Sequence, residues 1–207
     1  MYVDRVIYVV RAMRWSPLAI AVAVATTIVV AERNGDAAKP LEAVSILLAS
    51  ALGYLFDDPA ADLLDASPRP LLRRRVDRIG CALTPTVSLW IALVWIQRPA
   101  STNELLALSA MFAGLVGMSL GLAGLACRRL PAGHGGLYVG PALLALLIVS
   151  TTFPPRWRPL PLGDIPGGWS AIELRWATAA LVGSLVGLWS SRDRARRPPA
   201  HHQRRAT

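Results

Sequence analysis

LLALSAMFAGLVGMSLGLAGLAC, residues 105–127, is the longest apolar block of the sequence. It is long enough to cross a bilayer as a helix, for which ~20 predominantly apolar residues suffice. Four glycines recur along it at spacings of three, four and three residues: Gly114, Gly117, Gly121 and Gly124. This spacing places them on one face of a helix, where small residues allow two helix backbones to approach closely. The stretch therefore predicts a transmembrane helix with a tight packing face.

Five further apolar blocks flank this one, and together they predict six transmembrane helices, at about 15–31, 41–56, 79–97, 105–127, 137–153 and 171–191. The composition agrees, because 54% of the 207 residues are hydrophobic. The mean hydropathy is +0.43 although 22 residues are Lys or Arg, so the charges are confined to the connecting segments. The fold class expected is an all-α, polytopic membrane protein, with no room beside the apolar blocks for a separate soluble domain.

The basic residues are distributed unequally between the two sides of these spans. Sixteen lie in the N-terminal segment, the second and fourth loops and the C-terminal tail, and six lie on the opposite side. Because Lys and Arg accumulate in cytoplasmic loops, both termini are expected in the cytoplasm, as an even number of spans requires. The net charge of +9 is therefore interpreted as membrane topology in a cytoplasmic membrane, with no nucleic-acid partner.

The two ends of the chain differ in character. Residues 1–14, MYVDRVIYVVRAMR, place apolar side chains near one helical face and charges largely elsewhere, which predicts an amphipathic interfacial helix. Charges run through this stretch and no cleavage site follows, so it is not interpreted as a signal peptide. Residues 192–207 are basic and contain Pro198-Pro199, and we expect this tail to be disordered.

The loop 57–78 is the longest cytoplasmic connection and has an acidic and a basic half. Asp58 followed by Pro59 is an N-cap with proline at the first helical position, and Pro68 and Pro70 end the helix that follows. The residues expected to present this short helix to a partner are Asp58, Pro59, Asp62, Leu63, Leu64 and Asp65. A helix of two turns is unstable alone and requires a surface to pack on. The alternative is a solvated connector whose arginines set topology and contact anionic lipid: Arg73, Arg74, Arg75 and Arg78.

The external segment 154–169, PPRWRPLPLGDIPGGW, cannot form one regular helix because it contains five prolines. Trp157 and Trp169 make it too apolar for a free loop, so we expect it to fold back onto the outer leaflet as an external gate region. A connector of no functional weight is the alternative interpretation.

Glycine recurs in the last span as Gly183 and Gly187. Together with the glycines of block 105–127, these residues predict helix packing or a contact between protomers. A substrate path lined by glycine is the alternative.

Several kinds of chemistry have no signature in the sequence. There is no GxxxxGK[ST] motif, and the single lysine, Lys39, lies on the external side, so ATP hydrolysis by this chain is not expected. His134, His201 and His202 lack acidic or cysteine partners, so no metal site is expected, and Cys81 and Cys127 are interpreted as buried apolar residues. The centres of the spans carry no ionisable residue, which argues against an enzyme and against a proton-coupled exporter.

The layout as a whole resembles the transmembrane subunit of an ATP-binding cassette exporter of the type-two permease family, in its compact actinobacterial form. The likeness rests on the amphipathic N-terminal helix, six spans with both ends inside, the proline-rich segment before the last span and, most specifically, the loop LGYLFDDPAADLLDASPRPLLRRRVDRI. This bacterial family implies that residues 58–66 form a coupling helix that docks into a separate ATPase subunit, which binds ATP and Mg. The N-terminal helix would rest against that ATPase as a connecting helix.

The resemblance also implies a second permease protomer, because six spans supply half of a pathway. An uncharged pathway suits an apolar or amphipathic small molecule, lipid or peptide. A non-transporting membrane anchor or sensor that recruits a cytoplasmic protein through the same helix is the second interpretation. An enzyme of lipid metabolism that uses Asp58, Asp62 and Asp77 is the third.

Overall fold

The computed structural model describes residues 15–32, 38–54, 71–99, 101–129, 136–153 and 169–190, and in these ranges it contains helices and turns and no strand. The helices are α2 (Ser16–Ala31), α3 (Ala38–Gly53), α4 (Leu71–Gln97), α5 (Thr102–Arg129), α6 (Val139–Thr152) and α7 (Trp169–Ser190), with a short 3₁₀ helix, η2 (Gly136–Tyr138), before α6. The all-α class predicted from the sequence is confirmed for this part of the chain. Four predicted features lie outside it: the interfacial helix 1–14, the coupling helix 58–66, Trp157 and the tail 192–207.

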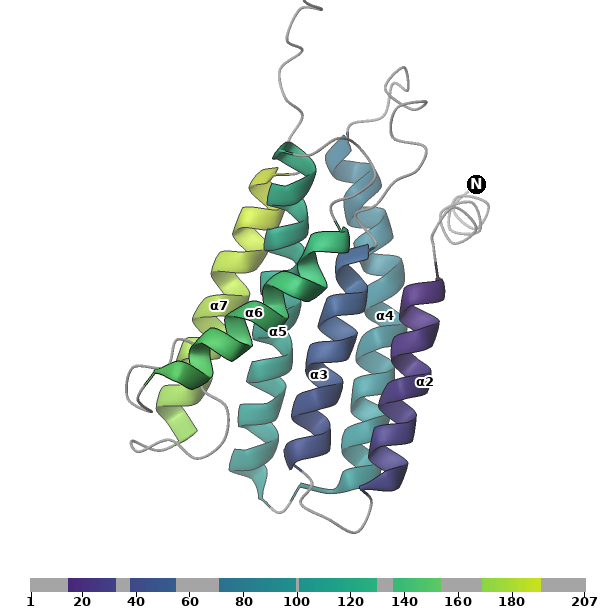
Figure 1. The fold of residues 1–207 in the computed structure, drawn as a ribbon, viewed down its shortest axis with the longest axis vertical. Coiled ribbons are helices and arrows are strands. Elements are labelled where there is room, and N and C mark those ends of the chain that lie inside the picture. The colour runs from purple at the N-terminus through teal and green to yellow at the C-terminus, as the bar shows by residue number, and fades with distance from the viewer. Residues whose placement is uncertain are drawn as a thin grey trace, which may run out of the picture.

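The long helices stand side by side, and consecutive helices run in opposite directions (Figure 1). Helix α5 lies at the centre, between α7 and α3, while α2 and α4 form one flank of the bundle and α6 crosses the face of α5 obliquely. The bundle therefore has two ends, separated by the length of α5. At 28 residues, α5 is about 42 Å long, which exceeds the ~30 Å thickness of a bilayer's hydrocarbon core.

Two helices are long and apolar enough to cross a membrane by length and composition: α4 over Val76–Gln97 and α5 over Thr102–Arg128. Shorter apolar helices occupy Ser16–Ala31 and Gly136–Leu146. The two long helices differ in their surroundings, because 61% of the apolar stretch of α5 is buried and only 22% of that of α4. Helix α5 is thus the core of the bundle, and α4 is a peripheral helix with an open outer face.

Helix α4 begins earlier than the sequence suggested. The predicted loop 57–78 contains residues 71–78, which are helical and continuous with the span that follows. The stretch LLRRRVDR has no glycine or proline, and Leu and Arg are good helix formers, so the helix extends to the residue after Pro70. Arg73, Arg74 and Arg75 therefore lie on the first turns of α4 rather than in a loop.

The turn between α4 and α5 is defined by two local signals. Arg98 has φ 51°, the left-handed conformation that ends many helices, and Pro99 follows it. At the start of α5 the backbone N–H of Glu104 donates to Ser101 Oγ at 3.2 Å, as in the Ser-x-x-Glu capping box. The short connection holds the C-terminal end of α4 beside the N-terminal end of α5.

Large apolar side chains cover the outer surface of the bundle. Trp95 is 76% exposed, Leu174 70% and Ile20 65%, which is unusual for a soluble protein. Further exposed residues of this kind are Val24 and Val30 on α2, Ile91 and Ile96 on α4, Leu144 and Ile148 on α6, and Leu181 and Leu185 on α7. Such a surface is suited to contact with lipid.

Many hydroxyl groups are hydrogen-bonded within their own helices. Each donates to the carbonyl oxygen four residues earlier, at 2.7–3.0 Å: Thr26 to Val22, Thr27 to Ala23, Ser45 to Leu41, Thr84 to Gly80, Thr86 to Ala82 and Thr178 to Leu174. Neither an apolar surrounding nor the interior of the bundle, where Ser45 and Thr86 are buried, offers water as a partner, and this arrangement satisfies the hydroxyl groups in both places.

Candidate functional site

The closest helix contact in the described residues joins α5 to α7 (Figure 1). A Cβ atom added at Gly117 would lie 2.5 Å from the carbonyl oxygen and 2.7 Å from the Cα of Ala180. A Cβ atom at Gly121 would lie 2.8 Å from the carbonyl oxygen of Gly183. Because these neighbours are backbone atoms, they cannot rotate away, and only glycine allows this approach.

The remaining glycines of the stripe lie at the same contact. Gly114 faces the buried Trp176, and Gly124 lies against Ser190 and Gly187. The six glycines predicted for helix packing or a dimer contact thus all lie at the contact between α5 and α7 of a single chain. Since their faces are covered by the chain's own helices, they do not line an open path between α5 and α7.

Arg128 fixes the C-terminal end of α7 to α5. Its Nε donates to the carbonyl oxygen of Ser190 at 3.0 Å, and its Nη2 donates to that of Trp189 at 2.8 Å. Its guanidinium carbon also lies 3.9 Å from the centre of the Trp189 ring, a cation–π contact. A cation at the last carbonyls of a helix satisfies groups that have no intrahelical partner and complements the helix dipole.

These contacts show that α5 and α7 run parallel. Trp176, early in α7, meets Gly114 of α5, and Ser190, at the end of α7, meets Arg128. At the other end of the bundle the Nε2 of the buried Gln97 donates to the carbonyl oxygen of Val29 at 3.0 Å and ties α4 to α2. Each end of the bundle is therefore closed by a side-chain hydrogen bond between neighbouring helices.

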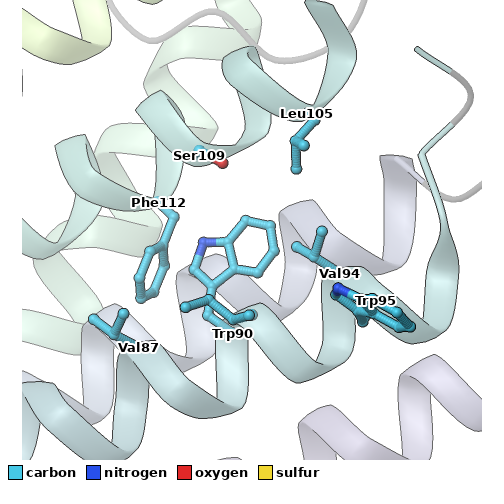
Figure 2. A pocket seen from close by; sticks show the side chains of 8 residues that line it. Val87, Trp90, Val94, Trp95, Leu105, Ser109 and Phe112 are labelled. Carbon is cyan, nitrogen blue, oxygen red and sulfur yellow. The ribbon is translucent and has the colours of Figure 1, made fainter. Parts of the chain in front are cut away.

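An apolar cavity of about 350 Å³ separates α4 from α5 (Figure 2). The ring of Trp90 stands at its centre, between Phe112 and Val94, and points toward Ser109 and Leu105 on α5. The Trp90 and Phe112 ring centres are 5.3 Å apart with the planes at 79°, the edge-to-face arrangement that aromatic pairs favour. The other lining residues are Val87, Ile91 and Trp95.

A second cavity, of about 310 Å³, continues from the first toward the end of α4. The two share Val94 and Trp95, and the second adds Arg98 and Pro99. The exposed side chains of Trp95 and Arg98 border it, and the two adjoining cavities together are apolar along α4 and α5 and cationic at the end of α4. We call the two adjoining cavities the α4–α5 groove. Among the ranges described, no group of three or more His, Cys, Asp or Glu residues could hold a metal ion.

Of the other predicted site residues, some lie in the described part of the chain and others do not. Asp58, Pro59, Asp62, Leu63, Leu64 and Asp65 lie in residues 55–70, outside the described part of the chain, as does Trp157. Arg78 is half-buried on α4, and Trp169 is the first residue of α7. The structure therefore does not test the predicted docking helix.

Sequence reasoning missed both the α4–α5 groove and the role of Arg128. For Arg128 the sequence holds a signal: an arginine ends one apolar block, and Trp189 and Ser190 end the next block that runs in the same direction. For the groove it holds none, because hydrophobic periodicity does not tell how far apart two helices pack.

Comparison with protein families, curated proteins and solved structures finds no match to this chain.

Proposed function

We propose that the chain is the membrane-spanning subunit of an ATP-driven exporter, with six transmembrane helices and a separate cytoplasmic ATPase that docks on residues 58–66. It would reside in the cytoplasmic membrane with both termini in the cytoplasm. A second permease protomer would complete the substrate pathway, and the cargo would be apolar or amphipathic. The chain itself would hold no ATP; ATP and Mg would bind to the partner ATPase.

The membrane location draws support from the surface of the bundle. Helices α4 and α5 are long and apolar enough to cross a bilayer, and exposed apolar side chains also lie on α2, α6 and α7. The alternation of helix directions is the arrangement that six consecutive spans require (Figure 1). On this proposal the shorter helices α2, α3 and α6 cross where the bilayer thins or where flanking residues reach the interface.

The observation that carries the coupling proposal is the position of the helix ends. The C-terminal end of α3 and the N-terminal end of α4, which residues 55–70 join, lie at the same end of the bundle as the C-terminal ends of α5 and α7 (Figure 1). Arg128 lies at this end, as does the arginine cluster 73–75 on the first turns of α4. By the positive-inside rule this end is cytoplasmic, which gives a cytoplasmic protein access to the acidic segment 58–66.

A movement of this segment would reach the bundle through α4. Helix α4 follows residues 55–70 directly, and 22% of its apolar stretch is buried, so few contacts resist its displacement. ATP-driven closure of a docked partner would shift α4 against the central pair of α5 and α7, which the glycine contacts hold together. This is a rigid-body mechanism in which one peripheral helix moves on a fixed core.

The docking helix is tested by the double substitution Leu63→Asp and Leu64→Asp. We expect the variant to insert normally and to lose stimulation of the partner's ATPase by at least tenfold, because two carboxylates replace the apolar centre of the contact. Ala60→Asp is the matched control, since it adds a charge to the first turn and leaves the leucine pair intact. Unchanged ATPase coupling in the leucine variant would contradict the docking assignment.

The same variant separates transport from a simple anchor. If the chain only recruits a cytoplasmic protein, the leucine substitutions will abolish recruitment, and the recruited protein will show no nucleotide turnover that depends on this subunit. If the wild type binds an ATPase and the leucine variant loses both the binding and the dependent ATP turnover, the anchor interpretation is excluded.

A further inference from the structure

The α4–α5 groove has no assigned role in the proposed transport cycle. It lies on the side of the bundle where α4 and α5 make few direct backbone contacts and Trp90 and Phe112 bridge the space between them. Ile91 is 58% exposed and Trp95 76%, so one wall of the groove opens to the surroundings of the bundle. A ligand could enter sideways from a surrounding lipid layer.

The groove changes character along its length. Between α4 and α5 its lining is aliphatic and aromatic, apart from the Ser109 hydroxyl. At the end of α4 the lining becomes Trp95, Arg98 and Pro99. Arg98 follows the last turn of α4, at the end of the bundle opposite Arg128, which is where a membrane helix meets the interface. Tryptophan and arginine are the residues that contact lipid headgroups at this depth.

We infer that the α4–α5 groove binds one acyl chain of an anionic phospholipid, with the phosphate of the headgroup against the guanidinium of Arg98. The inference uses the membrane location of the proposed function and is independent of transport and of the ATPase. An anionic lipid is the occupant because it combines a long apolar part with a negative end, and the groove combines an apolar lining with a cationic end. Arginine also matches phosphate geometry, since its planar group donates two parallel hydrogen bonds.

The size of the groove fits a single chain. Ligand pockets hold ~300–1,000 Å³, and the apolar cavity of about 350 Å³ lies at the lower limit. On this inference one chain occupies the cavity, and the second chain of a diacyl lipid lies on the outer face of α4, beside Ile91 and Trp95. A second copy of this protein would also bring apolar helices to this face, and the dependence of lipid binding on Arg98 distinguishes the two occupants.

The test uses the full chain, purified in mild detergent after reconstitution with equal amounts of phosphatidylglycerol and phosphatidylcholine. Native mass spectrometry then measures how much of each lipid remains bound. We expect the wild-type protein to retain phosphatidylglycerol in preference to phosphatidylcholine. Arg98→Gln should lower this preference about two- to fivefold, the range an exposed ion pair supports, and Arg98→Lys should keep most of it.

Two further variants separate the apolar groove from the charge. Ser109→Phe places a ring in the cavity and should reduce the retention of both lipids, whereas Ser109→Ala should not. Arg175→Gln, which removes another exposed cation, on α7, is the control for a nonspecific charge effect. Circular dichroism and the elution volume of each variant establish that it is folded.

The outcomes are decisive in either direction. Loss of phosphatidylglycerol preference in Arg98→Gln and loss of both lipids in Ser109→Phe support the site. Equal retention by the wild type and Arg98→Gln overturns it, as does an equal loss in Arg175→Gln or unchanged binding in Ser109→Phe. A dimer whose lipid content does not depend on Arg98 would assign the face to a second copy instead. Each of these results is obtained without an ATPase partner, so failure of the lipid site leaves the transport proposal to its own test.

Discussion

Replacing Gly117 with alanine should loosen the central pair of helices. The new Cβ atom would lie 2.5 Å from the carbonyl oxygen and 2.7 Å from the Cα of Ala180, whereas favourable carbon contacts lie at ~3.5–4.0 Å. Both neighbours belong to the α7 backbone, so the overlap can be relieved only by moving one helix away from the other. That movement would also weaken the neighbouring contact between Gly121 and Gly183.

The loss of stability expected from Gly117→Ala follows from the kind of overlap that the new methyl group makes. Adding a methyl group to a well-packed interior costs about 1–3 kcal/mol, and here no rotamer change can reduce it. Each kcal/mol lowers the midpoint of thermal unfolding by ~2–4 °C in a chain of this length, so we expect a fall of roughly 3–10 °C. The higher helix propensity of alanine, up to ~1 kcal/mol, offsets only part of this cost.

The assay is thermal unfolding in detergent, followed by tryptophan fluorescence and by the loss of the monodisperse peak. Gly80→Ala is the matched control: it lies on α4, and a Cβ atom there would meet no heavy atom within 4 Å. Alanine should leave stability unchanged or raise it there, since it favours a helix by up to ~1 kcal/mol over glycine. If Gly117→Ala unfolds at the same temperature as Gly80→Ala, the reasoning about the α5–α7 contact is wrong.

Three further predictions concern the two ends of the bundle and the termini of the chain. Arg128→Gln should lower the free energy of unfolding by about 1.5–3 kcal/mol, because it removes charged donors from the carbonyls of α7 and the contact with Trp189; unchanged stability in a denaturant titration would contradict the clamp. Gln97→Leu should lower the free energy of unfolding by about 1–3 kcal/mol and speed amide hydrogen exchange around Val29. Exchange equal to that of the wild type would show that the hydrogen bond between α4 and α2 is not formed in the membrane. A green fluorescent protein fused to either terminus should fluoresce, whereas alkaline phosphatase at the same positions should be inactive; active phosphatase would contradict cytoplasmic termini.

The positions of the helices could be predicted from the sequence because uninterrupted apolar blocks dominate it. Each of the six predicted spans coincides with a helix, and their ends agree to within a few residues in most cases. The start of α4 was missed because the arginine cluster was taken to mark a loop, although arginine is a good helix former. The start of α5 could have been found, since Ser101 and Glu104 form a recognisable capping box.

The pairing of helices was predictable only where two matching patterns exist. Glycines repeat in the blocks that became α5 and α7, and these helices meet glycine to glycine at Gly121 and Gly183. The α4–α5 groove has no such pattern, because it arises where two consecutive helices pack apart and an aromatic pair, Trp90 and Phe112, holds the space. The distance between two helices depends on crossing angles and side-chain packing that only the three-dimensional structure decides.

The exporter proposal is tested most directly by purifying the tagged protein from its native membranes and measuring what accompanies it. We expect an ATP-binding protein in equal amount, with an ATPase activity that requires this subunit and falls when Leu63 and Leu64 are replaced by Asp. A correctly inserted and monodisperse sample without a nucleotide-binding partner, or with one whose activity ignores this subunit, would contradict the account.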